Sequence, residues 1–211
     1  MLYTCDACGK RRADQAIDAG RNLAICPECG HARPFARMPL FAVGGASCTG
    51  KTAVCKALVG KVHGVVALDG DVLWDGRGHS PQDTKPFYED ALRIAMNVAQ
   101  SGLCVALFHA GFGVPPNLEN CVARRYFSAI HYLDLCCSEE EQEKRLLRRP
   151  AAQGPGGAGF VKGMLGFNRF LRFHDFAAEG FPSPEKLDTT GRALEETAAQ
   201  VVAWINARRS R

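Results

Sequence analysis

The sequence lacks the features that mark membrane-spanning and secreted proteins. It contains no apolar run of about 18 residues, so we expect no membrane-spanning helix. Residues 1–5 lack the basic and then apolar order of a signal peptide. Together these two absences predict a cytoplasmic protein.

The sequence also lacks a strong excess of charge of either sign. Its 26 Lys and Arg residues stand against 22 Asp and Glu residues, which gives a net charge of +4. This mild charge allows anionic ligands but does not by itself indicate a nucleic-acid-binding protein. The composition is that of an ordinary globular protein, and 211 residues suffice for one α/β domain plus a small appendage.

Cysteine is plentiful, with ten residues, but its placement does not indicate a disulfide framework. Four cysteines form two C-x-x-C pairs near the N-terminus, and the other six are scattered mostly among apolar residues. Reduced core thiols of this kind are typical of a reducing compartment. The cysteine usage therefore agrees with the cytoplasmic prediction.

The two pairs are Cys5-x-x-Cys8 and Cys26-x-x-Cys29, with 17 residues between them, which is the spacing of a four-thiolate zinc site. A glycine follows each second cysteine and lets the backbone fold back toward sulfur. Four thiolates complete the tetrahedral coordination of Zn²⁺, so the predicted zinc is structural. Two disulfides or free thiols are the alternative. His31 is expected to be a surface residue.

We expect residues 1–36 to form a zinc ribbon, followed by a linker at 33–37. A unit of this size buries too little apolar surface to fold alone, so metal binding should be coupled to its folding. Its basic side chains leave docking to nucleic acid or protein open beside a purely structural role. The sequence does not support docking to single strands, since Tyr3 is the only aromatic residue before Phe35.

The segment 45–52 matches the phosphate-binding pattern G-x-x-x-x-G-K-[ST] at every fixed position. A buried strand is predicted before it at 39–44, and a helix after it from residue 53. In that context backbone N–H groups and the helix N-terminus hold phosphate oxygens. Lys51 is expected to reach the β- and γ-phosphates, and the Thr52 hydroxyl to bind Mg²⁺. The predicted nucleotide-binding residues are Gly45, Ala46, Ser47, Cys48, Thr49, Gly50, Lys51 and Thr52.

Beyond this segment, predicted strands and helices alternate, which favours an α/β fold with a parallel sheet covered on both sides. Ser138 is expected to begin its helix with a capping box. The further predicted strands are at residues 64–69, 103–108, 129–135 and 186–190. The further predicted helices are at about 80–100, 116–127, 138–149 and 160–173 and in the C-terminal segment.

Asp69 and Asp71 form a D-x-D pattern at the end of the second predicted strand. With the phosphate-binding segment, this pattern resembles small P-loop kinases of the nucleoside-monophosphate-kinase type, and within them the branch with shikimate, gluconate and chloramphenicol kinases. The resemblance spans about residues 39–208. It implies a three-layer P-loop kinase domain at 37–211, which follows the zinc ribbon.

The resemblance also implies roles for these acids. Asp69 would help hold Mg²⁺, and Asp71 would orient the acceptor hydroxyl or accept its proton. The γ-phosphate repels a nearby carboxylate. A carboxylate at this position therefore indicates that it binds a metal ion or accepts a hydroxyl proton. Two solvated turn aspartates are the alternative. Asp75 is a further candidate for acceptor contact.

The basic segment at 143–149 resembles the family helix that leads into the lid, which we expect at about 145–175. By this resemblance, Arg145 and Arg149 would reach over the triphosphate when the lid closes. The two residues are one helical turn apart and can share a face, although a solvated basic face is the alternative. The glycine-rich stretch at 153–159 is expected to give the lid mobility.

One departure from adenylate-kinase-like enzymes concerns the acceptor. Those enzymes carry an arginine after the third strand that grips the acceptor's phosphate. Here His109 follows that strand, and no arginine occurs before Arg124. This favours a neutral, hydroxyl-bearing acceptor. His109 stands where ligands bind to such sheets, so it either contacts substrate or is a structural histidine.

The sequence therefore predicts an ATP-dependent phosphotransferase that moves the γ-phosphoryl group to a hydroxyl of a small molecule, with Mg²⁺ and structural Zn²⁺. A nucleoside or nucleotide kinase is the second hypothesis. A nucleic-acid-associated NTPase or end kinase is the third, and a regulatory nucleotide switch the fourth. The predicted catalytic residues are Lys51, Asp69, Asp71, Arg145 and Arg149.

Overall fold

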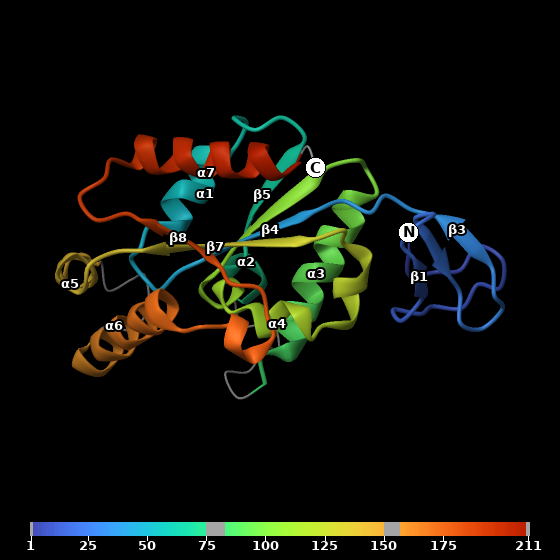
Figure 1. The fold of residues 1–211 in the computed structure, drawn as a ribbon, viewed down its shortest axis with the longest axis horizontal. Helices are drawn as coiled ribbons and strands as arrows, with labels where there is room; N and C mark the ends of the chain where they lie inside the picture. The colour runs from blue at the N-terminus through green and yellow to red at the C-terminus, as the bar shows by residue number, and fades with distance from the viewer. Residues whose placement is uncertain (1, 75–82, 150–156, 210–211) are drawn as a thin grey trace.

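The computed structural model describes residues 2–74, 83–149 and 157–209. Figure 1 shows a larger sheet between helices and a small sheet beside it at the N-terminal side. The five strands of the larger sheet are parallel and lie in the order β5-β6-β4-β7-β8, which confirms the predicted α/β class. These strands are β4 (Leu40–Gly44), β5 (Val65–Asp69), β6 (Cys104–Phe108), β7 (Ile130–Cys136) and β8 (Glu185–Asp188).

Strand β4 occupies the centre of the sheet because its residues are apolar on both faces. All five are buried, as are all five residues of β6. Val43 pairs with Phe108 on one side and with Leu133 on the other. A fully buried parallel strand of this kind delivers the chain to the carboxyl edge of the sheet, where ligands bind in open α/β folds.

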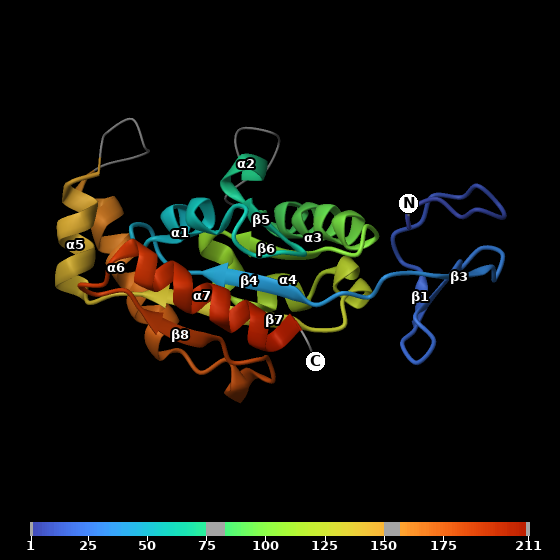
Figure 2. The same cartoon turned by 90° about the horizontal axis from the view of Figure 1, so that it is seen from above.

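Helices cover both faces of the sheet, as Figures 1 and 2 show. One face carries α1 and α7, whose buried residues share an apolar core with Phe41 and Leu135. The other face carries α3, α4 and the 3₁₀ helix η2, around a core that includes Leu40 and Phe87. The α-helices are α1 (Lys51–Leu58), α2 (Asp71–Trp74), α3 (Lys85–Ala99), α4 (Pro115–Glu119), α5 (Glu139–Leu147), α6 (Ala158–Phe173) and α7 (Leu194–Arg209). The 3₁₀ helices are η1 (Ala110–Gly113), η2 (Val122–Tyr126) and η4 (Ala177–Glu179).

None of the described helices has the length and apolar character needed to cross a membrane.

The N-terminal part is a three-stranded antiparallel sheet in the order β1-β2-β3, which we call the ribbon (residues 2–36). It lies at the end of the molecule where the central strand β4 begins, far from α5 and α6 (Figure 2). Its strands are β1 (Ala16–Asp18), β2 (Leu23–Ile25) and β3 (Ala32–Pro34). Arg33 and Pro34 therefore belong to a strand and not to the predicted linker, which leaves a shorter connection to β4.

The helix predicted at 116–127 is wrong as a single element. Helix α4 ends at Glu119, Cys121 is extended (φ −81°, ψ 146°), and η2 begins at Val122. The cause is the buried carboxylate of Glu89 on α3, which accepts hydrogen bonds from the amides of Val122 at 2.8 Å and Ala123 at 3.2 Å. This tertiary acceptor satisfies the first N–H groups of a second helix, so the chain restarts there.

The capping box at Ser138 forms only in part. The Ser138 hydroxyl accepts from the Glu141 amide at 3.2 Å, which confirms the helix start. The Ser138 amide, however, donates to the Thr190 hydroxyl at 2.8 Å, and the Glu141 carboxylate pairs with Arg145. Helix α3 begins at Lys85, and the first residues predicted for it, 80–82, lie outside the described residues.

Candidate active site

The phosphate-binding segment lies between the end of β4 and the start of α1, at the carboxyl edge of the sheet. Gly45 and Gly50 have φ values of 136° and 107°, a backbone region that glycine adopts without strain. A Cβ on Gly45 would lie 2.4 Å from the Leu135 carbonyl oxygen, so no other residue fits that approach. Cys48 also has a positive φ of 66°, which bends the tip of the loop.

Side chains hold this loop in shape from within. Thr49 is fully buried, and its hydroxyl donates to the Ala46 carbonyl at 2.9 Å. Lys51 Nζ donates to the same carbonyl at 2.9 Å, so the ammonium group lies over the loop. Thr52 is exposed in the first turn of α1, where its hydroxyl is available to a ligand.

Burial makes the positive charge of the Lys51 ammonium group unfavourable in the ligand-free protein. Burial lowers the pKa of Lys51 to about 8, although the nearby carboxylates of Asp71 and Asp69 act in the opposite direction. A buried ammonium group that keeps part of its desolvation cost gains strongly from an anionic ligand. The site therefore favours binding of an anionic ligand, which adds negative charge beside Lys51 to that of Asp69 and Asp71.

Asp69 ends β5, and Asp71 begins α2 two residues later. Asp69 Oδ1 accepts from the Asp71 amide at 3.1 Å, which fixes the turn between them. The Asp71 side chain is 72% exposed, so its carboxylate is open to a substrate. Partial desolvation and the charge of Asp69 raise the pKa of Asp71, which makes it a better proton acceptor than an ordinary aspartate.

His109 follows β6, the neighbour of β5, and faces Asp71. Its Nδ1 accepts from the Gly111 amide at 3.1 Å, and its Nε2 lies 3.7 Å from Asp71 Oδ1. Burial and the charge of Lys51 lower the pKa of His109 to about 4, so the ring is neutral at pH 7. Because Nδ1 is an acceptor, Nε2 carries the proton and directs it toward the Asp71 side.

Aromatic side chains surround the ring of His109. Phe87 on α3 has its ring centroid 4.6 Å away, Phe112 on η1 5.3 Å and Trp74 on α2 6.0 Å. Both phenylalanines are fully buried, whereas Trp74 is partly exposed. Asp75, a predicted acceptor contact, lies outside the described residues.

Two arginines of the α5 segment reach the phosphate-binding loop from its other side. Arg149 Nη1 donates to the Ser47 hydroxyl at 2.8 Å. Arg145 pairs with Glu141 at 2.8 Å and donates to the Thr189 carbonyl at 3.0 Å and the Cys48 carbonyl at 3.5 Å. Helix α5 ends at Leu147, so Arg149 lies beyond it and the predicted shared helix face is wrong, although both arginines reach the loop from the same side. Residues 150–156 of the expected lid lie outside the described residues.

An ion pair that the sequence pattern did not indicate lies beneath the loop. Asp134 on β7 is fully buried, and its Oδ2 lies 2.7 Å from Lys186 Nζ on β8. Burial raises the pKa of Asp134 to about 6, while Lys186 acts to lower it. Its Oδ1 has no hydrogen-bond partner and would lie 1.9 Å from a Cβ on Gly113. An acid within the apolar strand segment was the available signal.

Gln142 was also missed, although it ties the helices to the loop. This residue is fully buried on α5. Its amide Nε2 donates to the Ser47 carbonyl at 3.0 Å and to the Met164 carbonyl of α6 at 3.1 Å. The helices of the expected lid therefore have a fixed attachment to the phosphate-binding loop.

The four paired cysteines come together in the ribbon, as their spacing predicts. Their sulfur atoms all lie within 4.8 Å of one another, with Cys5–Cys29 at 3.7 Å and Cys8–Cys26 at 3.8 Å. A tetrahedron with Zn–S bonds of about 2.3 Å has sulfur–sulfur edges of roughly 3.8 Å. The donor set therefore fits Zn²⁺.

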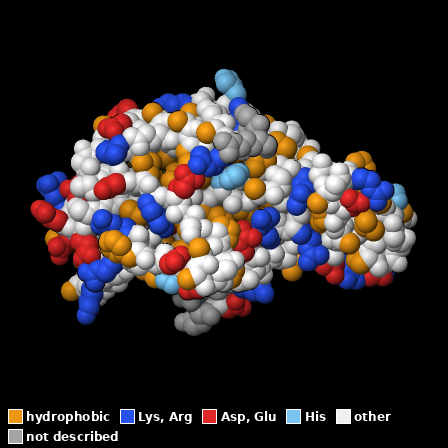
Figure 3. Space-filling model, in the orientation of Figure 1, with side chains coloured by type: hydrophobic (Ala, Val, Ile, Leu, Met, Phe, Trp, Pro, Cys, Tyr) orange, Lys and Arg blue, Asp and Glu red, His pale blue; other side chains and the backbone are white. Residues whose placement is uncertain are grey.

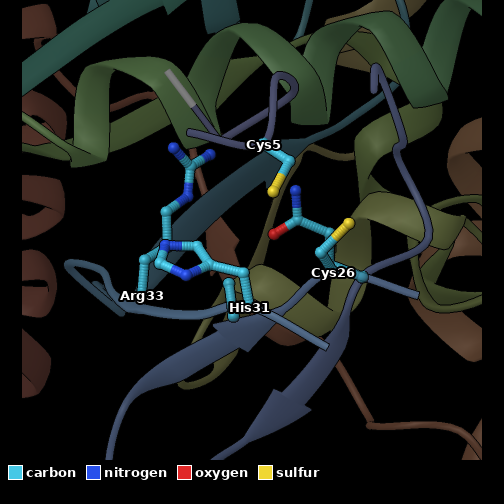
Figure 4. A pocket seen from close by; sticks show the side chains of 6 residues that line it. Cys5, Cys26, His31 and Arg33 are labelled. Carbon is cyan, nitrogen blue, oxygen red and sulfur yellow. The ribbon is translucent and has the colours of Figure 1, made fainter. Parts of the chain in front are cut away.

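The surroundings of the sulfurs also match the predicted zinc site. Gly9 and Gly30 have φ values of 69° and 71°, as the turns require. The Cys8 amide in particular lowers the pKa of the Cys5 thiol. His31 is exposed and lies beside Arg33 in Figure 4, on the surface as expected.

The similarity of this chain to known proteins lies in its three-dimensional structure and not in its sequence. No protein-family model matches the sequence, and no curated protein matches it. A sugar kinase from Janibacter is similar in structure, with 14% identity, a TM-score of 0.58, and coverage of 82% of this chain and 97% of that one. A gluconokinase from Sinorhizobium meliloti has 15% identity and a TM-score of 0.54 over 84% of this chain and 96% of that chain.

APS kinase of Mycobacterium tuberculosis, in complex with AMPPNP and APS, has 18% identity and a TM-score of 0.50 over 82% of this chain and 99% of that chain. Because these proteins are matched over nearly their full lengths, the chain has the P-loop kinase fold. The predicted three-layer architecture is thereby confirmed.

Proposed function

We propose that this protein is an ATP-dependent phosphotransferase that moves the γ-phosphoryl group to a hydroxyl of a small molecule. One observation carries the proposal: Lys51, Asp71 and Arg149 converge on the phosphate-binding loop from three separate elements. The charges of Asp71 and Arg149 both act on Lys51, and those of Lys51 and Arg149 both act on Asp71. Cations beside a carboxylate are what in-line phosphoryl transfer needs.

The individual roles follow from position. Lys51 and Arg149 bind and neutralise the phosphates, and Arg145 holds the loop through Thr189. Thr52 and Asp69 offer the hydroxyl and carboxylate oxygens that Mg²⁺ prefers. When bound, Mg²⁺ supplies charge neutralisation at the phosphates. Asp71 accepts the acceptor hydroxyl's proton.

We assign residues 1–36 to a structural zinc ribbon and 37–211 to the phosphotransferase domain, with a lid at about 145–175. We further propose a cytoplasmic location, because four zinc-binding thiolates persist in a reducing compartment. The similarity to sugar, gluconate and APS kinases supports a small-molecule acceptor over a macromolecular one.

A nucleotide acceptor is the second candidate, and the position of Arg124 counts against it. Arg124 is the first arginine after β6, and it pairs with Glu119 at 2.6 Å and donates to the Phe127 carbonyl. These contacts hold its guanidinium within the η2 region, away from the Asp71 side. It therefore does not supply the phosphate grip that a nucleoside monophosphate requires.

Nucleic-acid docking through the ribbon is also disfavoured, because three of its arginines, Arg12, Arg21 and Arg33, pair with its own acids. Arg12 pairs with Asp14 at 2.7 Å, and Arg21 with Asp18 at 2.6 Å. Figure 3 shows basic and acidic side chains intermixed over the visible face of the ribbon. Such neutralised arginines release few counterions on binding a phosphate backbone.

The test is ATP turnover against nucleosides, nucleotides, sugars and phenolic or aminoglycoside-like alcohols. We expect Asp71→Asn to lower transfer by about 10²–10⁴-fold, with the affinity for a fluorescent ATP analogue largely kept. Asp90→Asn, at an acid on α3 whose side chain is 49% exposed, is the control and should retain activity. Full activity of Asp71→Asn would remove that residue from the mechanism.

A further inference from the structure

The ribbon buries its apolar side chains against α3 and η2. Leu2, Ala24 and Phe35 are all buried and belong to the same core as residues of these two helices. Phe35 meets Tyr126 of η2 edge to face at 6.0 Å, and Tyr3 lies under the Arg93 guanidinium of α3 at 5.3 Å. The ribbon is thus part of the kinase core and not a tethered module.

Hydrogen bonds fix the register of this interface. The Tyr126 hydroxyl donates to the Ala13 carbonyl at 2.8 Å, and Arg125 Nη1 donates to the Gln15 carbonyl at 3.2 Å. At the end of α3, the Gln100 side chain exchanges two hydrogen bonds of 3.1 Å with the Ala36 backbone. Backbone groups of the ribbon are the partners throughout, so the contacts require the ribbon to be folded.

Helix α3, to which η2 is joined, continues to the Asp71 side of the active site. Glu89 of α3 binds the first amides of η2, and the preceding residues Phe87 and Tyr88 pack on the turn that carries His109. The Tyr88 hydroxyl lies against Gly111, where an added Cβ would be 2.1 Å away. Helix α3, about 22 Å long at 1.5 Å per residue, spans the distance between the ribbon and His109.

Metal binding determines whether the ribbon is folded and can make these contacts with α3 and η2. Its strands have three residues each, and its own apolar core is small. A unit of this size with four converging thiols folds on binding zinc. The interface residues lie close to the ligands in sequence: Tyr3 is two residues before Cys5, and Ala24 two before Cys26.

We propose that the zinc-bound ribbon is a positioning element for the acceptor side of the active site. Zinc occupancy orders α3 and η2, and through Phe87 and Tyr88 it sets the His109 turn that faces Asp71. The donor side, where α1 follows the phosphate-binding loop, makes no hydrogen bond, ion pair or ring contact with the ribbon among the described residues, and it keeps its order without zinc. The name acceptor side rests on the proposed function, whereas the coupling itself does not.

The test uses the full-length zinc-loaded protein, treated with a zinc-selective chelator and then resupplied with Zn²⁺. Amide hydrogen exchange should become about tenfold faster in residues 85–99 and change less than about twofold in 51–58, with recovery on zinc addition. Affinity for a fluorescent ATP analogue should stay within about twofold, because the phosphate-binding loop is unaffected.

A second readout uses the two tryptophans of the chain. In a Trp204→Phe background Trp74 is the remaining tryptophan, and it lies 5.2 Å from Phe87 and 6.0 Å from His109. Its emission should shift to longer wavelength when zinc is removed. This signal reports on the acceptor side without any phosphoryl acceptor being known.

A matched pair of variants distinguishes the effect of losing an interface contact from the effect of losing zinc. Arg125→Ala removes the donor to the Gln15 carbonyl, and we expect faster exchange in 85–99 with zinc content unchanged. Arg21→Ala, whose partner is Asp18 within the ribbon, should leave that exchange unchanged. Equal effects of the two variants would contradict the proposed route through η2.

Two outcomes would overturn the proposal. In one, the chelated protein loses protection in residues 2–36 while residues 85–99 and Trp74 do not respond. In the other, 51–58 and 85–99 lose protection equally, which would make the effect global. If the coupling holds but no acceptor is ever phosphorylated, the proposed function fails and the positioning role stands.

Discussion

Replacing Lys51 by methionine should make the ligand-free protein more stable at neutral pH. The charge of Lys51 is unfavourable in the folded state, because burial lowers its pKa from 10.5 to about 8. This difference corresponds to about 3 kcal/mol at pH 7. The variant loses the hydrogen bond from Nζ to the Ala46 carbonyl, which costs about 1 kcal/mol. A net gain of about 2 kcal/mol should remain.

The stability difference between Lys51→Met and the parent protein depends on pH in a direction that the lowered pKa fixes. A lysine with a lowered folded-state pKa destabilises the protein fully below about pH 8, and the penalty disappears as the pH rises toward 10.5. The advantage of Lys51→Met should therefore shrink by about 2 kcal/mol between pH 7 and pH 9.5. Urea unfolding of both proteins at the two pH values, without nucleotide, measures it.

The control is Lys56→Met, at an exposed lysine of the same helix, which should change stability little at either pH. In the presence of ATP and Mg²⁺ the order should reverse, because the ligand stabilises only the protein that binds it. If Lys51→Met is instead less stable than the parent by the same amount at pH 7 and pH 9.5, then Lys51 carries no desolvation penalty and the reasoning fails.

Three further predictions concern buried groups and glycine positions elsewhere in the fold, each measured by urea unfolding. Lys186→Met leaves the buried Asp134 unpaired and should cost about 3–5 kcal/mol at pH 7, and less at pH 5, where a carboxyl with a pKa near 6 is neutral. Gly113→Ala places a methyl group 1.9 Å from Asp134 Oδ1 and should be severely destabilising, whereas Gly166→Ala, with no atom within 4 Å, should stabilise by up to about 1 kcal/mol. Glu89→Ala removes the acceptor for two amides of η2 and should cost about 1–3 kcal/mol.

The donor half of the site could be predicted because its signal is local. A strand, a glycine loop and a helix follow one another in the chain, and the residue types at Gly45, Gly50 and Lys51 fix the loop's geometry. The D-x-D at the end of β5 was placed correctly for a similar reason, since the carboxyl ends of parallel strands meet at one edge.

Other contacts depend on strand order and register, which the sequence does not reveal. His109 was known to follow a strand, but only the adjacency of β5 and β6 brings it to Asp71. Asp134 meets Lys186 because these residues are directly paired between β7 and β8. No local sequence pattern marks either contact. Individual residues could therefore be predicted from the sequence, but the contacts between them could not.

The difference between the two halves explains why the acceptor side is where a metal-dependent element is useful. The donor loop is continuous in the chain, and Thr49 and Lys51 within it both donate to the Ala46 carbonyl, while Gln142 and Arg149 attach it from the α5 side and not from the ribbon. The acceptor side is assembled from α2, α3 and η1, with η2 behind them, and these elements are separate segments between residues 71 and 126. Fixing them relative to one another costs conformational entropy, and their own helices are short except for α3. A folded ribbon that holds the far end of α3 supplies contacts that these segments cannot make among themselves.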